Sequence, residues 1–144
     1  MPSIEERFSA AMHGTARAWR LAVDRRLKHL GLSQASWMAI AFIAKESEAL
    51  SQTRLAARVG VEDPTMVATI DRLVKAGYVV RTPSETDRRV KLVSLTEQGQ
   101  QIYQSVWQEA SAFRLELLGG ADPAVLRVVT EFLETLLTEI ESRP

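Results

Sequence analysis

Cysteine is absent from this chain of 144 residues, and histidine occurs only twice, as His13 and His29. The absence of cysteine excludes disulfides, thiolate metal sites and thiol-based redox sensing. The two histidines form neither a metal-ligand cluster nor a nucleophile–base pair, and no glycine-rich phosphate loop occurs. We therefore expect no enzyme, no metal site and no cofactor.

Long apolar runs are also missing, because no stretch approaches the ~20 residues that a helix needs to cross a bilayer. The opening residues MPSIEERFSA have neither the basic start nor the apolar run of a secretion signal. These two absences predict a cytoplasmic protein with no membrane partner.

Net charge is zero over the whole chain, but the two ends differ. Residues 1–91 hold 15 Lys and Arg against 10 Asp and Glu, whereas residues 92–144 hold 3 against 8. Such an asymmetry suggests that one end meets a polyanion, although a split of this size also arises by chance.

The first thirty residues carry one apolar stripe at steps of three and four, which predicts a long amphipathic helix ending at Gly31. The stripe consists of Ile4, Phe8, Met12, Ala16, Trp19, Val23, Leu27 and Leu30. A helix of about 25 residues is roughly 38 Å long. This is long for a globular core and calls for a partner chain or a second long helix.

Three shorter helices and two strands are predicted in the middle of the chain. Serine caps and terminal glycines delimit the second and third helices, and an Asp-Pro pair opens the fourth with aspartate as its N-cap. The limits are Ser33, Ser51, Gly60, Asp63-Pro64 and Gly77. Short β-branched runs at 78–82 and 90–95 then predict two strands joined by a turn.

Two further helices follow, one capped by Thr96 and one opened by Asp122-Pro123 after the break at Gly119-Gly120. The order of elements predicts a mainly α fold with a small β-hairpin. We place a winged helix-turn-helix at 33–95, with the helices of 1–31 and 96–144 as a dimerisation region.

In a helix-turn-helix, the second helix enters the DNA major groove and its N-terminal residues meet base edges. Residues 64–76 are the candidate, with Val67, Ile70, Leu73 and Val74 expected on the inward face. The opposite face is expected to carry Thr65, Ala68, Thr69, Arg72 and Lys75. Threonine and arginine side chains can donate to phosphates or bases, but any surface helix has a polar face.

The turn SETDRR presents two arginines at the tip of the hairpin. A hairpin beside a recognition helix can reach the minor groove, where negative potential favours arginine. Asp87 stands two residues before Arg89 and can hold its guanidinium in one rotamer. Arg88 is available for a phosphate. The alternative is a solvated turn with local ion pairing, which the dipeptide alone would favour.

At these residues the chain resembles the MarR family of bacterial transcriptional regulators, and within it the SlyA-like branch. The similar segments are LAARVGVEDPTMVATIDRLVKAGYVVR, SETDRRVKLVSLTEQG and ARAWRLAVDRRLKHLGLSQASW. They include Arg81 after the first strand, the D-x-R wing and the strand end L-T-x-x-G. The resemblance covers nearly the whole chain and is strongest from Ala16 to Gly99.

The resemblance implies that Arg89 is a minor-groove arginine positioned by Asp87, and that Arg88 contacts the DNA backbone. It also implies that Pro64, Thr65 and Thr69 lie where the family meets DNA. Members of the branch often carry arginine where this chain has Ala68. The missing guanidinium should weaken base readout at one position by about 1–3 kcal/mol.

A homodimer through the two chain ends would cover the long apolar stripes, and it is also the arrangement that the resemblance implies. Two-fold symmetry then predicts a palindromic operator with half-sites ~34 Å apart. The alternative is that these helices pack only on their own chain.

The resemblance also implies release from DNA by a small aromatic acid. Arg17 could take the carboxylate, with Trp37, Ser33 and Ser36 at the head of the second helix forming the rest of the site. Interface salt bridges and core packing explain the same residues. A remaining alternative for the whole chain is a winged helix that only binds proteins, against which the basic wing argues.

Overall fold

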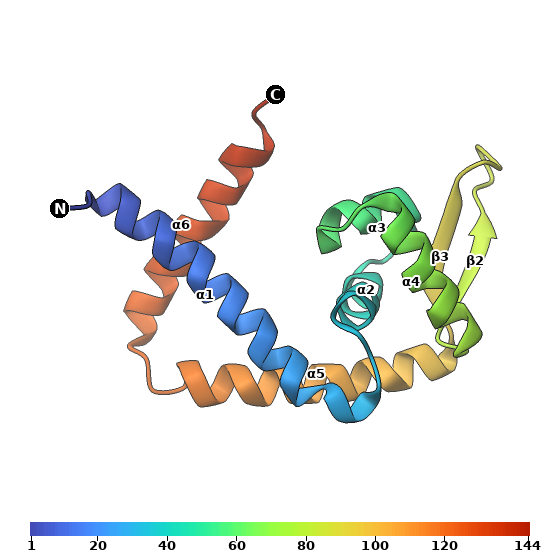
Figure 1. The fold of residues 1–144 in the computed structure, drawn as a ribbon, viewed down its shortest axis with the longest axis horizontal. Helices are drawn as coiled ribbons and strands as arrows, with labels where there is room; N and C mark the ends of the chain where they lie inside the picture. The colour runs from blue at the N-terminus through green and yellow to red at the C-terminus, as the bar shows by residue number, and fades with distance from the viewer. The chain divides into compact units, whose positions relative to one another are not determined.

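The computed structural model describes residues 1–144, which form six α-helices, one 3-10 turn and a three-stranded sheet. This confirms the predicted mainly helical winged fold (Figure 1). The elements are α1 Ile4–Arg26, η1 Lys28–Leu30, α2 Gln34–Lys45, β1 Leu50–Ser51, α3 Gln52–Val59, α4 Asp63–Lys75, β2 Val79–Pro83, β3 Lys91–Leu95, α5 Glu97–Leu118 and α6 Pro123–Glu141. Two compact units, Met1–Ala110 and Ser111–Pro144, divide the chain within α5.

Side-chain caps fix most of the helix starts where the sequence predicts them. Ser33, Ser51 and Asp122 each accept a backbone N–H in the first turn of α2, α3 and α6. Each cap satisfies a donor that has no partner inside the helix. The first helix is shorter than predicted, because α1 ends at Arg26 and a single 3-10 turn leads to Gly31.

The core of the first unit lies between α2, α3, α4 and the sheet. Its fully buried side chains come from every one of these elements and include Ile40, Leu55, Met66, Ile70, Val79 and Val93. The stripe of α1 is buried only toward its C-terminal end, at Val23 and Leu27, whereas Ile4 is exposed. Burial of these apolar groups is the main stabilising term for the lobe.

The sheet is antiparallel with strand order β1–β3–β2. Val79 pairs with Leu95 and Pro83 with Lys91, so each strand of the hairpin begins one residue later than predicted. The third strand, β1, was not predicted. It pairs Leu50 with Val93 through only two residues, and a strand of that length has no alternating pattern in the sequence.

The inward face of α4 differs from the prediction. Val67 and Val74 were expected in the core but are 41% and 38% exposed, whereas Met66 and Thr69 are completely buried. The buried side of α4 is centred on Met66, Ile70 and Leu73. The prediction used hydrophobicity alone and therefore placed the neighbouring valines in the core. Thr69 is tolerated inside because its hydroxyl donates to the backbone oxygen of Thr65 at 2.8 Å. Helix α4 also begins one residue early, so Asp63 is its first residue and Glu62 its N-cap.

The end of α4, the start of β2 and the start of α5 meet at one tight joint. The Thr96 hydroxyl donates to the Gly77 oxygen at 2.5 Å and accepts the Gly99 N–H at 3.0 Å. The Thr96 N–H donates to the Tyr78 oxygen at 3.0 Å. Gly77 has a φ of +85°, a conformation that side chains disfavour. This joint holds the base of the hairpin against the C-terminal end of α4.

Candidate nucleic-acid interface

The outer face of α4 presents four of the five residues of this helix that are expected to meet DNA. Pro64, Thr65, Ala68 and Arg72 are exposed, and the first two lie in the first turn of the helix. Backbone N–H groups at a helix N-terminus favour phosphate oxygens. Thr69 does not belong to this face, because its buried hydroxyl already donates to Thr65 and lies 3.4 Å from Arg72 Nη2.

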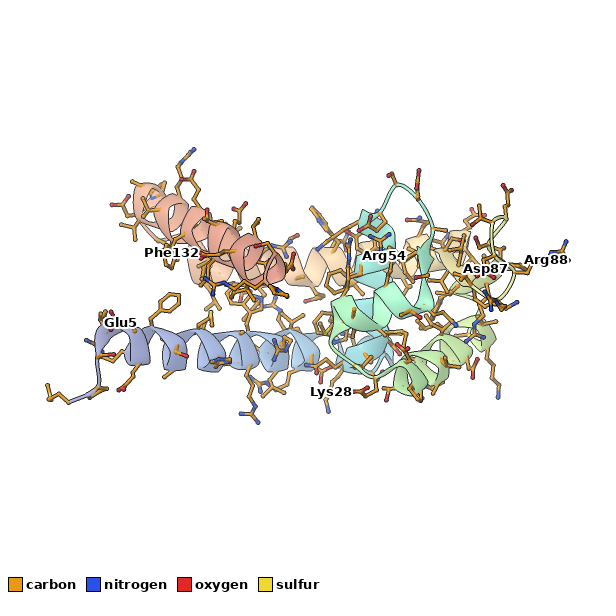
Figure 2. The ribbon with its side chains drawn as sticks, turned by 90° about the horizontal axis from the view of Figure 1, so that it is seen from above. Glu5, Lys28, Arg54, Asp87, Arg88 and Phe132 are labelled. Atoms are coloured by element: carbon orange, nitrogen blue, oxygen red, sulfur yellow. The ribbon has the colours of Figure 1, made fainter.

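The hairpin tip is closed by short-range hydrogen bonds. The Val90 N–H donates to the Asp87 oxygen and the Ser84 N–H to the Val90 oxygen, each at 2.9 Å. The Thr86 N–H donates to the Ser84 hydroxyl at 3.3 Å. These bonds give residues 84–90 a defined backbone, with Arg88 at the far tip of the hairpin (Figure 2).

Asp87 holds Arg89 through both its carboxylate oxygens. Its Oδ1 accepts the backbone N–H of Arg89 at 3.0 Å and the guanidinium Nε–H at 3.2 Å, and its Oδ2 accepts from Nη2 at 3.2 Å. The Arg89 side chain is nevertheless 92% exposed. Three of the five guanidinium N–H donors stay available to an outside acceptor. The pair therefore fixes the direction of a cation without burying it.

The charge on Asp87 is favoured by the same contacts. Hydrogen bonds from the Arg89 guanidinium, and then from its backbone N–H, hold the pKa of the Asp87 carboxyl below its ordinary value. A carboxyl with a lowered pKa stays ionised at neutral pH, so the pairing persists under physiological conditions.

Arg81 is a residue whose role the sequence did not reveal. It lies on β2, and its guanidinium contacts both helices of the helix-turn-helix. The resemblance singled it out only as a position in a pattern. Strand alternation was the usable signal, since residues two apart lie on one face and Val79 is in the core.

Of the four residues expected to bind a small acid, three lie in the first turn of α2 and its cap, and the fourth lies on α1. Ser33 is the N-cap of α2 and its hydroxyl donates to the Ser36 hydroxyl at 2.9 Å. Trp37 is 9% exposed, and its Nε1–H donates to Asp24 Oδ1 at 3.0 Å. Arg17 is exposed on α1. These contacts give Ser33, Ser36 and Trp37 structural roles, and ligand binding by the four stays a prediction.

A cavity of about 400 Å³ opens beside this segment, between α1, the start of α2 and the end of α3. Its lining is Arg20, Gln34, Ala35, Met38, Arg58, Val59, Gly60 and Val61. Arg58 also forms an ion pair with Glu46. The volume is in the range of small-molecule sites, and the lining combines apolar walls with two guanidinium groups.

No group of three or more His, Cys, Asp or Glu residues lies close enough together to hold a metal ion. None of the helices is both long enough and apolar enough to traverse a membrane.

Known proteins share the architecture of this chain. A family model described as MarR family matches residues 30–90. The transcriptional regulator PA3341 is 35% identical, with 94% of this chain and 99% of that chain covered and a TM-score of 0.87.

Two more distant structures share the fold. A MarR family regulator from Silicibacter pomeroyi DSS is 23% identical, with 94% and 91% of the two chains covered and a TM-score of 0.86. CouR from Rhodococcus jostii RHA1, bound to p-coumaroyl-CoA, is also 23% identical, with 94% and 95% covered and a TM-score of 0.80. Proteins of this family are transcriptional regulators and not enzymes. The chain belongs to the MarR family of transcriptional regulators.

Proposed function

We propose that this protein is a sequence-specific regulator that binds double-stranded DNA as a homodimer on a palindromic operator. The observation that carries the proposal is the joint exposure of the α4 face and the wing arginines on one lobe. We assign residues 33–95 to DNA binding, and residues 1–31 and 96–144 to dimerisation. We also place the chain in the SlyA-like branch, acting as a repressor.

Helix α4 enters the major groove in this proposal. Thr65 and Pro64 approach the phosphates at the helix N-terminus, and Arg72 reaches a base edge or a phosphate from the next turns. Ala68 offers only a methyl group at the same face. A methyl can pack on a thymine methyl but cannot replace a bidentate arginine contact, so readout at that position is weak.

The wing enters the adjacent minor groove. Arg89 is directed by Asp87 and provides the cation for the groove. Arg88 lies at the hairpin tip (Figure 2) and meets the DNA backbone in this proposal. Because Asp87 already restricts the guanidinium, less side-chain freedom is lost when the complex forms. A narrow minor groove concentrates negative potential and so attracts this arginine.

Replacing Arg89 tests the proposal directly. We expect Arg89→Ala to weaken operator binding at least tenfold, and to lower the slope of log affinity against log salt if the arginine also neutralises a phosphate. Lys28→Ala is the matched control, since it removes one positive charge from the exposed turn η1. Equal binding by Arg89→Ala and wild type would contradict a wing contact. Loss of thermal stability in Arg89→Ala would make the residue structural.

The proposed dimer is supported by the exposed apolar face of α6. Along this helix Val125, Val129, Phe132, Leu137 and Ile140 are each 48–59% exposed. Contiguous apolar surface of this kind is typical of an interface. We expect Leu137→Glu to dissociate the dimer in sedimentation equilibrium. Thr138→Glu, which places the same charge on the opposite face, should leave it intact, and monomeric wild-type protein would contradict the proposal.

Release by a small aromatic acid is the second part of the proposal. It is supported by the cavity between α1, α2 and α3, where Arg20 can pair with a carboxylate and Met38 and Val59 supply apolar contacts. The cavity adjoins the segment that contains Ser33, Ser36 and Trp37. CouR has been solved with p-coumaroyl-CoA, an aromatic acyl ligand. Calorimetry with salicylate tests this part, and no heat of binding together with unchanged DNA affinity would contradict it.

The alternative is a winged helix that binds only other proteins. Arg88 and Arg89 disfavour it, because two exposed guanidinium groups at a hairpin tip suit a polyanion. Failure of the wild-type protein to bind any duplex at low salt would favour this alternative over DNA binding.

A further inference from the structure

Arg81 connects the strand β2 to both helices of the helix-turn-helix. Its Nε–H donates to Gln52 Oε1 of α3 at 2.6 Å. Its Nη2 donates to the backbone oxygen of Val67 in α4 at 3.1 Å and lies 2.7 Å from Asp71 Oδ1, also in α4. One planar group therefore makes three contacts to two helices, which a flexible point charge could not do together.

The strand places Arg81 where it can make these contacts. Val79 and Arg81 lie on one face of β2, and Val79 is 1% exposed in the core. The Arg81 side chain is 25% exposed, so it lies at the rim of the core and not in open solvent. Its backbone pairs with Val93 of β3, the central strand of the sheet.

The contacted atoms of α4 form a flank beside the face that we assign to DNA. Val67 and Asp71 are four residues apart and therefore lie one above the other on the helix. Ala68 and Arg72 each follow one of them directly in sequence and lie about 100° further round the helix. The contacts of Arg81 with Val67 and Asp71, called the Arg81 clamp below, fix the rotation of α4 about its axis. They therefore also fix the direction in which the exposed face points.

We propose that Arg81 is a positioning residue that sets the geometry of the recognition helix relative to the wing. The inference rests on the proposed DNA-binding function and explains how two separate contact elements keep one spacing. Helix α4 and the hairpin lie side by side, and the hairpin tip extends beyond the helices (Figure 1). Arg81 is the residue of β2 whose side chain bonds to α4. With the spacing fixed in advance, both elements engage DNA without a further cost of ordering.

Loss of the Arg81 clamp should reduce specificity more than it reduces nonspecific affinity. For Arg81→Ala we expect operator affinity to fall by roughly tenfold or more, because base readout requires both elements in register. Affinity for unrelated duplex should change less than about threefold, and the slope of log affinity against log salt should stay at the wild-type value. A direct phosphate contact would instead lower that slope by about 0.9.

The free charge of Asp71 is the main competing explanation, since it would repel DNA once Arg81 is gone. The double variant Asp71→Ala with Arg81→Ala removes that charge. Recovery of operator affinity in the double variant would overturn the positioning role. Continued loss of specificity would support it. Arg81→Lys keeps the charge but cannot contact α3 and α4 together, so it should lose specificity as Arg81→Ala does. This variant tests the positioning role even if Arg81→Ala folds poorly.

A measurement without DNA separates this inference from the proposed function. The chain has no cysteine, so Lys75→Cys and Glu85→Cys allow spin labels at one site on α4 and one on the wing. We expect the distance distribution between the labels to broaden in Arg81→Ala and Arg81→Lys, with helicity retained. Arg54→Ala, which removes another exposed arginine from the lobe, is the control and should not change it. An unchanged distribution in both Arg81 variants would overturn the positioning role whether or not the protein binds DNA.

Discussion

Gly99→Ala should destabilise the fold strongly, although alanine is the better helix former. A Cβ atom at Gly99 would lie 2.0 Å from the backbone oxygen of Tyr78 and 3.2 Å from Leu95 Cβ. The contact at 2.0 Å is more than 1 Å closer than carbon and oxygen tolerate without bonding. Backbone and not a flexible side chain blocks the space, so α5 or the start of β2 has to move.

The loss in the free energy of unfolding can be estimated from the contacts between Gly99, Tyr78 and Thr96. Overpacking of a tight site costs about 1–3 kcal/mol. The Tyr78 oxygen also accepts the Thr96 N–H at 3.0 Å, and loss of that bond adds about 1 kcal/mol. The higher helix propensity of alanine offsets about 0.5–1 kcal/mol of this destabilisation. A net loss of about 1–3 kcal/mol should lower the melting temperature by roughly 3–12 °C.

Thermal and urea unfolding followed by circular dichroism measure this loss. Gly14→Ala is the matched control, because Gly14 lies within α1 and an added Cβ meets nothing within 4 Å. It should stabilise the protein by about 0.5–1 kcal/mol. If Gly99→Ala unfolded at the wild-type temperature, the close approach of α5 to the start of β2 would be wrong.

Three further predictions concern side chains whose roles the structure defines. Thr69→Val should lower stability by about 1 kcal/mol through loss of the internal hydroxyl bond and leave operator affinity unchanged, and a tenfold loss of affinity would return Thr69 to the interface. Titration of Asp87 should not change operator affinity between about pH 5 and 8, because the pKa of this carboxyl is lowered. The pairing with Arg89 is lost only as pH falls through that lowered pKa. Asparagine cannot titrate, so if Asp87→Asn lost operator affinity at acid pH just as the wild type does, protonation of Asp87 would not be the cause of the loss. Trp37→Phe should cost about 1–3 kcal/mol in urea unfolding by removing the bond to Asp24, whereas Asp24→Asn keeps an acceptor and should cost less.

Local chemistry explains why the order of elements could be predicted. Caps such as Ser33, Ser51 and Asp122 act through bonds to residues two or three positions away, so their signal lies within the sequence of one turn. The wing was recognisable for a similar reason, since Asp87 and Arg89 pair across only two residues. These features depend little on the rest of the fold.

Features that depend on tertiary contacts were predicted less well. The burial of Thr69 in place of Val67 follows from which side of α4 packs on α2 and α3, and a threonine that satisfies its own hydroxyl gives no sign of this in the sequence. Strand β1 exists only through its pairing with β3. Strand alternation indicates only that Arg81 shares a face with Val79. Its three contacts join segments up to 29 residues apart, and the sequence pattern does not identify these partners.

Selection of bound duplexes from a random DNA pool, followed by the affinity for the selected duplex as a function of salt, tests the central claim most directly. We predict an enriched palindrome with half-sites ~34 Å apart, and log affinity that falls steeply with log salt concentration because several phosphates are neutralised. Binding without an enriched sequence, or no binding at low salt, would contradict a sequence-specific regulator that reads DNA through α4 and the wing.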